Sequence, residues 1–328
     1  LPDRIRAAHA LANKHVNLTQ FADNLFGFVA FCTHLWSSFY SHLGWANSKG
    51  EDQEIVFHAA AYKHVDLVEK NVVSGLVVNV LGTFNVLRHA KSSGCQSFTL
   101  ISTDKAVRPT NVMGATKRLA EKIVASFARD DASGLRFSIV RFGNVAGSSG
   151  SVIPLFQQQV LSGGPITITD PRATRFFMTI PEAVELILCS TEFRESFGFF
   201  VLDMGKPISI LEIAQRIADR MGVTLATDDN PDGEIKIDVI GLRPGEKMYE
   251  ELSINNNLSA TEHSRILRVN DESSDLLDPD LIIETIKENV TTRDIPKILK
   301  LLERHVEGFS SNQSFLTNKE ESSLVNPD

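Results

Sequence analysis

The sequence has few cysteines, no excess of positive charge and no long apolar run. Its cysteines, Cys32, Cys95 and Cys189, are odd in number and far apart, which excludes a complete disulfide framework and any recognisable metal-binding spacing. The formal net charge of -8 argues against a nucleic-acid binder held by phosphate contacts. We therefore expect a cytoplasmic protein without metal or nucleic acid, and the 42% of hydrophobic residues is ample for a buried core.

A glycine-rich nucleotide loop is also missing before Glu51. The glycines in that stretch are Gly27, Gly44 and Gly50, and their spacing forms no such loop. Dinucleotide-binding folds open with a strand, a glycine-rich turn and a helix whose N-terminus holds the pyrophosphate. We treat residues 1–50 as a segment of uncertain structure, and a truncated or mis-joined gene product with an intact active-site half is the simplest account.

Residues 24–48 contain no Lys, Arg, Asp or Glu and are rich in aromatic side chains. Such a segment could lie at or across a membrane, which would place the protein at the cytoplasmic face of the inner membrane. Its histidines and serines, and the shortness of its longest apolar run, favour a buried segment instead.

From Glu51 onward, apolar strand patterns alternate with helical ones. Strands are predicted over 54–61, 96–103 and 136–145, and helices over 65–94 and 112–130. Shorter elements follow: helices over 152–164, 180–193 and 209–222, and a strand over 165–170. Alternation of this kind implies parallel strands joined by right-handed crossovers.

Polar and small residues follow three of the predicted strands. They are "HAAAYKH" from His58, "STDK" from Ser102 and "RFGNVAGSSGS" from Arg141. Ligands of parallel α/β sheets bind at the carboxyl ends of the strands. The small side chains of Ala59 and Ala60 would let a flat cofactor approach the backbone, and Thr103, Asp104 and Lys105 would face it.

These stretches resemble the extended short-chain dehydrogenase/reductases, and within them the nucleotide-sugar 4,6-dehydratases of bacterial polysaccharide biosynthesis. The matching stretches are "VFHAAAYKHVDLVEKN", "NVLGTFNV", "STDKAVRPTNVMGATKRLAE", "RFGNVAGSSGSVIPLF", "TRFFMTIPEAVELIL" and "GLRPGEKMYEEL". The resemblance implies an α/β fold: a doubly wound, Rossmann-like parallel sheet, incomplete at its N-terminus, with a small C-terminal substrate-binding lobe. Residues 51–307 would form this domain, and the polar residues 308–328 a disordered tail.

The resemblance implies a reaction on UDP-N-acetylglucosamine. The hydride at C4 goes to NAD+, preferred here to NADP, water leaves across C5 and C6, and the hydride returns to C6. Thr103 would hydrogen-bond the O4 hydroxyl, Asp104 would protonate the leaving O6, and Lys105 would be the base at C5. Lys117 would hold the nicotinamide ribose and lower nearby pKa values through its charge.

Met113 stands where most of the wider superfamily has a tyrosine that accepts a proton. A thioether cannot take a proton at neutral pH. The resemblance points to a subgroup with methionine here, typically large and membrane-anchored, in which Asp104 or Lys105 would deprotonate O4. The alternative is that Met113 only packs in its helix and activity is lost.

Further site residues complete the prediction. Cofactor contacts are expected from His58, Ala59, Ala60, Asn79, Ser102 and Lys117. Substrate contacts are expected from Lys63, Asn144, Ser151, Arg175, Arg243 and Glu246, with the arginines suited to a diphosphate. A nucleotide-sugar substrate and a homo-oligomer are the expected partners. Two rival interpretations stay open: a non-catalytic remnant that binds a nucleotide sugar or a partner, and a nucleotide-sugar epimerase.

Overall fold

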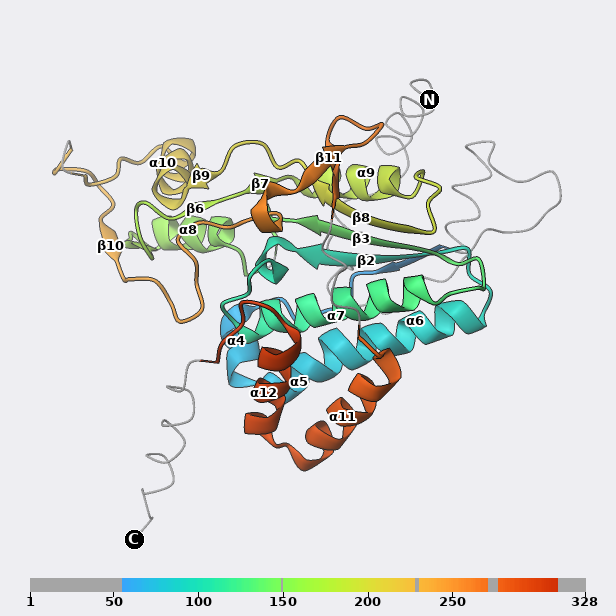
Figure 1. The fold of residues 1–328 in the computed structure, drawn as a ribbon. Coiled ribbons are helices and arrows are strands. Elements are labelled where there is room, and N and C mark those ends of the chain that lie inside the picture. Colours follow the sequence, from blue (N-terminus) through green and yellow to red (C-terminus); the bar gives the residue numbers. More distant parts are fainter. Residues whose placement is uncertain (1–54, 149, 228–229, 271–276, 312–328) are drawn as a thin grey trace, which may run out of the picture.

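The computed structural model describes residues 55–148, 150–227, 230–270 and 277–311, which form a central sheet with helices on both faces (Figure 1). The predicted segment 1–50 lies outside the described residues, as do residues 312–328 of the tail predicted over 308–328. The first residues of that tail pack on the domain instead of being disordered, because Phe309 is buried and Ser311 Oγ donates to Glu303 Oε1 at 2.7 Å. The sheet has six strands in the order β1-β2-β3-β8-β12-β11. They are β1 (Ile55–His58), β2 (Ser97–Thr103), β3 (Arg136–Phe142), β8 (Phe197–Leu202), β12 (Ile266–Val269) and β11 (Leu258–Ala260).

The first four strands in this order are parallel, whereas β12 and β11 pair in antiparallel fashion. In strand β2, Phe98 and Leu100 alternate with Ser97 and Thr99, and all four are buried, because helices cover both faces of a parallel sheet. Within the described part of the chain, β1 pairs with β2 alone. The arrangement confirms the predicted α/β class with a mainly parallel sheet.

One face of the sheet is covered by a nearly continuous helical stretch and by α7 (Val112–Arg129). The stretch comprises α4 (Val65–Lys70), α5 (Val72–Leu76), the π-helical turn η1 (Val77–Leu81) and α6 (Gly82–Ser92). Helix α6 ends at Ser92, and Gly94 follows with a positive φ of 73° that suits glycine. The sequence predicted that the helix stops at this glycine. Residues Val72–Ser92 are long and apolar enough to cross a membrane, yet Leu76 and Val80 belong to the large core.

Helices α11 (Pro279–Thr292) and α12 (Ile295–His305) pack outside α7 on the same face. Helix α9 (Ile180–Ser190) covers the opposite face and begins with a capping box between Thr179 and Glu182. The last two helices of the described chain therefore belong to the core around α7.

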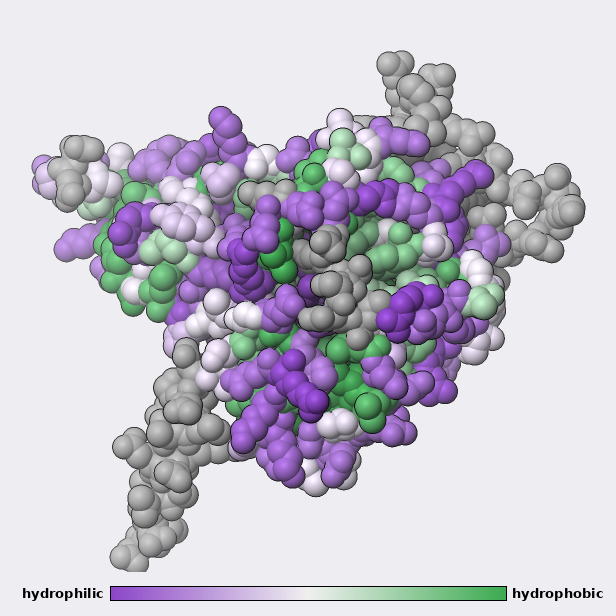
Figure 2. Space-filling view, in the orientation of Figure 1, coloured by the Kyte–Doolittle hydropathy of each residue, from purple (hydrophilic) through white to green (hydrophobic). Residues whose placement is uncertain are grey.

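A smaller unit lies beside the carboxyl ends of the strands (Figure 1). It contains α8 (Val152–Leu161), α10 (Ile210–Met221) and the strand pairs β5 (Ile166–Ile168) with β10 (Ile237–Val239) and β6 (Thr174–Arg175) with β9 (Ile208–Ser209). Phe156, Ile166 and Ala214 are part of its separate core. Figure 2 shows apolar side chains gathered over this unit, where Leu161 and Val239 are exposed.

Several short elements follow or precede the strands of the central sheet. A 3-10 turn, η2 (Asp104–Ala106), follows β2, and β4 (Asn144–Val145) pairs with β7 (Phe177–Met178) after β3. A second 3-10 turn, η3 (Ile254–Asn256), precedes β11.

Candidate active site

The site is built where β2 and β3 end side by side. Their parallel register pairs Thr103 with Phe142, so the residues that follow each strand emerge next to one another. Gly143 makes this approach possible, since a Cβ there would lie 3.1 Å from Asp104 Oδ2 and 2.9 Å from Phe176 Cβ. The sheet thus brings the Thr-Asp-Lys triplet alongside Asn144.

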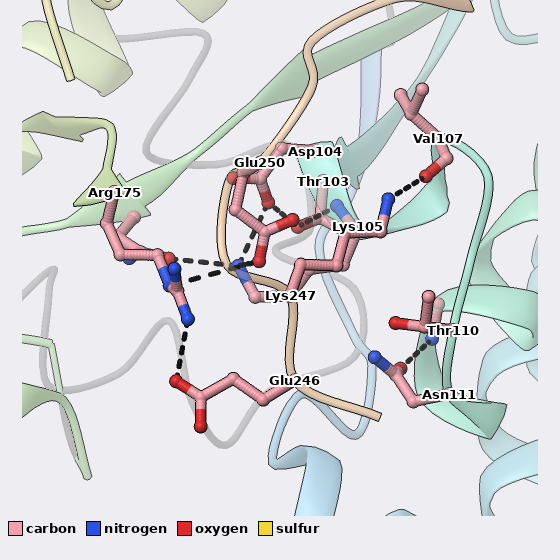
Figure 3. A network of polar contacts seen from close by, with 12 residues as sticks. Thr103, Asp104, Lys105, Val107, Thr110, Asn111, Arg175, Glu246, Lys247 and Glu250 are labelled. Atoms are coloured by element: carbon pink, nitrogen blue, oxygen red, sulfur yellow. Dashed lines mark hydrogen bonds and ion pairs between the residues drawn. The ribbon is translucent and has the colours of Figure 1, made fainter. Parts of the chain in front are cut away.

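Thr103, Asp104 and Lys105 form one hydrogen-bonded group (Figure 3), which Asn144 joins through Lys105. Thr103 Oγ1 donates to Asp104 Oδ1 at 2.9 Å, and Lys105 Nζ donates to the same oxygen at 3.0 Å. Lys105 Nζ also donates to Asn144 Oδ1 at 3.0 Å. The Asp104 side chain is fully buried, whereas that of Lys105 is 21% exposed. Lys105 and Thr103 therefore face outward, with the acid behind them.

A segment far away in the sequence crosses in front of this group. This crossing segment, residues 243–251, is tied down by Lys247, whose Nζ donates to the Val107 carbonyl at 2.7 Å. Thr110 and Asn111 both donate to the Gly245 carbonyl, at 2.8 and 2.9 Å. The segment is thereby fixed against the loop between Lys105 and α7.

Arg175 connects the crossing segment to the triplet. Its Nη2 donates to Glu246 Oε1 at 2.6 Å, and its Nε lies 3.9 Å from Glu250 Oε1. The same Glu250 oxygen is 3.7 Å from Lys105 Nζ, and the Glu250 side chain is only 4% exposed. Arg175 and Glu246, both predicted, thus meet Lys105 through Glu250, which the sequence reasoning missed. Its signal was present, since Glu250 stands in the quoted "GEKMYEEL".

The charges of this group shift one another's proton affinity. Burial acts to lower the pKa of Lys105, but the carboxyl groups of Asp104 and Glu250 outweigh it and the pKa is raised. Burial raises the pKa of Glu250, and the charge of Asp104 adds to this against the opposing effect of Lys105. The resting site therefore favours a protonated lysine.

The other three predicted substrate residues lie in the loop after β1, at the start of α8 and in the crossing segment. Lys63 is half-buried in the loop after β1, and burial, together with the charge of Lys105, lowers its pKa. Ser151 is the N-cap residue of α8, and its hydroxyl makes no side-chain cap. Arg243 is exposed, and its backbone N–H donates to Glu246 Oε2 at 3.2 Å.

Helix α7 carries the other two predicted catalytic residues. Lys117 Nζ donates to the Ile101 carbonyl at 2.7 Å, and burial lowers its pKa to about 8 against the opposing charge of Glu121. Met113 is 3% exposed and packs in the large core. Gly114 lets the helix start close to the triplet, since a Cβ there would lie 2.2 Å from the Lys105 carbonyl oxygen. Asn111 caps this start by accepting from the Gly114 N–H.

The predicted cofactor residues with polar side chains are engaged within the protein. His58 Nε2 lies 3.0 Å from Thr83 Oγ1, and burial, followed by the charge of Lys117, lowers its pKa to about 4. Asn79 bonds the backbone N–H and C=O of Tyr62, at 2.7 and 3.0 Å. Ser102 donates to Glu121 at 2.5 Å. Asn79 thus shapes the loop at the end of β1, where Ala59 and Ala60 lie half-buried.

A buried ion cluster beneath the site also escaped the sequence reasoning. Glu121 on α7 accepts from Arg141 Nε and Nη2 at 2.8 and 2.6 Å and from Arg118 Nη1 at 3.2 Å. Arg141 and Glu121 are fully buried, and Arg141 lies over the Phe199 ring at 4.5 Å. The sequence did contain a signal for this cluster, because Glu121 and Arg141 are charged residues within the apolar patterns of α7 and β3. The cluster joins α7 to both strands that carry the site.

The residues at the ends of β1 and β2 fit the nicotinamide half of a dinucleotide. Ala59 and Ala60 leave the backbone open to a flat ring, and Lys117 supplies an ammonium group on the next helix. The pyrophosphate would need main-chain donors at a glycine-rich turn, and none occurs between β1 and α7 in the described residues.

Comparisons with known proteins agree with this picture. A family model described as "Polysaccharide biosynthesis protein" matches residues 47–271. The "Capsular polysaccharide biosynthesis protein CapD" of Staphylococcus aureus is 45% identical over 74% of this chain and 39% of its own length. A "UDP-glucose 4-epimerase" of Rickettsia rickettsii is 40% identical over 60% of this chain and 55% of its own length.

Among solved structures, that of Pen from Bacillus thuringiensis has a TM-score of 0.59 at 32% identity. The match covers 73% of this chain and 76% of that chain. The chain thus spans about two-fifths of the length of the Staphylococcus relative and about half of the Rickettsia one.

Proposed function

The chain belongs to the polysaccharide biosynthesis protein family, and from this premise we propose that it is an NAD-dependent nucleotide-sugar 4,6-dehydratase. The proposed substrate is UDP-N-acetylglucosamine, and the product is a 4-keto-6-deoxy sugar nucleotide. The observation that carries the proposal is the hydrogen-bonded set of Thr103, Asp104 and Lys105, because elimination across C5 and C6 needs both an acid and a base. Epimerisation at C4 needs no such pair.

Each member of the triplet has a role that its position supports. Lys105, partly exposed, removes the proton at C5, which the neighbouring 4-keto group makes acidic. Thr103 binds the O4 hydroxyl. Asp104 supplies the proton for the leaving O6, and its hydrogen bonds to Thr103 and Lys105 provide the route, since its own carboxyl is fully buried. When bound, NAD+ supplies the oxidation at C4 and the return of the hydride to C6.

The proton on O4 cannot go to Met113, whose side chain is buried in the core. Lys105 or Asp104 accepts it instead, because Thr103 Oγ1 donates to Asp104 Oδ1, the same oxygen to which Lys105 Nζ donates. Lys117 remains positively charged near neutral pH, since its pKa lies at about 8, and it would hold the ribose of the cofactor. Arg175, with Arg243 and Lys63, would bind the diphosphate.

Epimerisation is the second candidate function, and the similarity to the Rickettsia epimerase favours it. The two reactions differ in mass balance. A dehydratase product has lost one water, whereas an epimerised sugar has the mass of its substrate.

The test is mass spectrometry of UDP-N-acetylglucosamine after incubation with the chain, with and without added NAD+. We expect loss of one water and a rate about 10²–10⁴-fold lower in Asp104→Asn, because the acid is removed while the shape of the side chain is kept. An epimer of unchanged mass would establish the second candidate. Unchanged substrate from folded protein at high NAD+ would leave a non-catalytic remnant.

A further inference from the structure

Oxygen atoms from three separate segments surround Lys105 Nζ. Asp104 Oδ1 and Asn144 Oδ1 each accept a hydrogen bond from it at 3.0 Å. Glu250 Oε1 forms an ion pair with it at 3.7 Å, and Figure 3 shows the Glu250 carboxyl beside Lys105 and Asp104. The ammonium form of Lys105 thus lies between two carboxyl groups, Asp104 on its own strand end and Glu250 on the crossing segment.

Each of the two carboxyl groups has one oxygen atom without a hydrogen bond. Asp104 Oδ2 and Glu250 Oε2 are both buried and have no hydrogen-bond partner among the described residues. The charged groups that face Glu250 are Lys105, Asp104, Arg175 and Lys247. Burial, with one oxygen left unpaired, raises the pKa of Glu250 and so favours a proton on this carboxyl.

We propose that Glu250 is a positioning residue of the acid–base group: its buried carboxyl forms an ion pair with Lys105 Nζ and controls whether the proton between Lys105 and Asp104 stays on the lysine. The inference rests on the proposed function, because the proton in question is the one that elimination uses.

The control works through charge. An ionised Glu250 holds the ammonium form of Lys105 by attraction at 3.7 Å. A protonated Glu250 no longer does so, and a proton can then move along the 3.0 Å hydrogen bond from Lys105 Nζ to Asp104 Oδ1. In this transfer one N–H bond breaks and one O–H bond forms, and Glu250 keeps its own proton. The transfer provides the base for C5 and the acid for O6 once the proton released from O4 has passed to solvent through Lys105, whose side chain is 21% exposed.

The test measures the protonation of Lys105 directly, without substrate or cofactor. The chain is labelled with acetic anhydride across a pH series, and acetylation of Lys105 is quantified by mass spectrometry. Its side chain is 21% exposed, so the reagent has access. Glu250→Gln removes the charge and keeps the shape, and the labelling midpoint of Lys105 should fall by about 1–3 pH units.

Glu251→Gln is the matched control, because Glu251 is the next residue and pairs with Arg108 at 2.7 Å instead of Lys105. Its Lys105 midpoint should equal that of the wild type. Glu250→Asp, one methylene shorter, should shift the midpoint in the same direction by less, and it serves as the second arm if Glu250→Gln does not fold. An unchanged midpoint in a folded Glu250 variant would overturn the proposal. Because no turnover is measured, failure of the dehydratase assay would leave this result standing.

Discussion

Lys117 gives the molecule a pH-dependent stability that a single substitution should remove. Burial lowers its pKa from 10.5 to about 8, so between these values the unfolded chain binds a proton that the folded chain releases. Stability therefore rises with pH across this window, because the unfolded state binds more protons there. Below pH 8 both states carry the charge, and the folded state bears the full cost of burying it.

The size of the effect follows from the two pKa values. With 1.36 kcal/mol per pKa unit, the contribution of Lys117 to the free energy of unfolding should increase by about 2 kcal/mol between pH 7 and pH 9.5. Lys117→Met keeps the length of the side chain and removes the titrating group. The wild type should therefore gain about 2 kcal/mol of unfolding free energy over this range that Lys117→Met does not gain. The unfolding free energy of Lys117→Met minus that of the wild type should fall by the same amount.

Urea denaturation at both pH values, followed by circular dichroism, measures this difference. Contributions from other titrating groups cancel between the two proteins. Lys300→Met, at an exposed position of α12, is the matched control and should give the same difference at both pH values. A Lys117→Met difference that does not change with pH would refute the buried, proton-losing lysine.

Two further substitutions test the scaffold under the site. Gly114→Ala would place a Cβ 2.2 Å from the Lys105 carbonyl oxygen, and it should lower the free energy of unfolding, measured by urea denaturation, by about 1–3 kcal/mol. Gly82→Ala is the control. Its Cβ would meet nothing closer than 3.6 Å, and it should be neutral or stabilise the protein by up to about 1 kcal/mol. Equal effects of the two would show that the approach of α7 to the triplet is not tight. Glu121→Gln leaves Arg141 buried without its counter-charge and should cost about 3–5 kcal/mol by the same measurement, against less than about 0.5 kcal/mol for the exposed Glu284→Gln. A small loss at Glu121 would mean that the ion cluster does not hold the strands to α7.

The elements nearest the site could be predicted because their patterns are local. The strand pattern of β2, the helical spacing of α7 and the glycine that follows α6 each identify an element without reference to the rest of the chain. The parallel sheet then follows from their alternation. Strands β8, β12 and β11 and helices α11 and α12 were not predicted, because the regular alternation ends after β3.

The site divides in the same way. Thr103, Asp104, Lys105 and Asn144 could be expected together, since neighbouring parallel strands end at one edge of the sheet. Glu250 could not, because it reaches Lys105 only through the packing of the crossing segment against Val107 and Asn111. The bonds of Ser102 to Glu121 and of Asn79 to the Tyr62 carbonyl could not be predicted either, because they depend on how distant segments pack, and the cofactor contacts expected of both residues stay predictions.

The central claim is most directly tested by running the reaction in deuterium oxide and analysing the product by mass spectrometry and NMR. The proposed mechanism predicts loss of one water and one deuterium at C5, because Lys105 removes the proton there and solvent protons exchange with the site. It predicts no such product from Lys105→Met. A product that carries no deuterium on carbon and still has its O6 would contradict the elimination. Thr103, Asp104 and Lys105 would then not have the roles proposed for them.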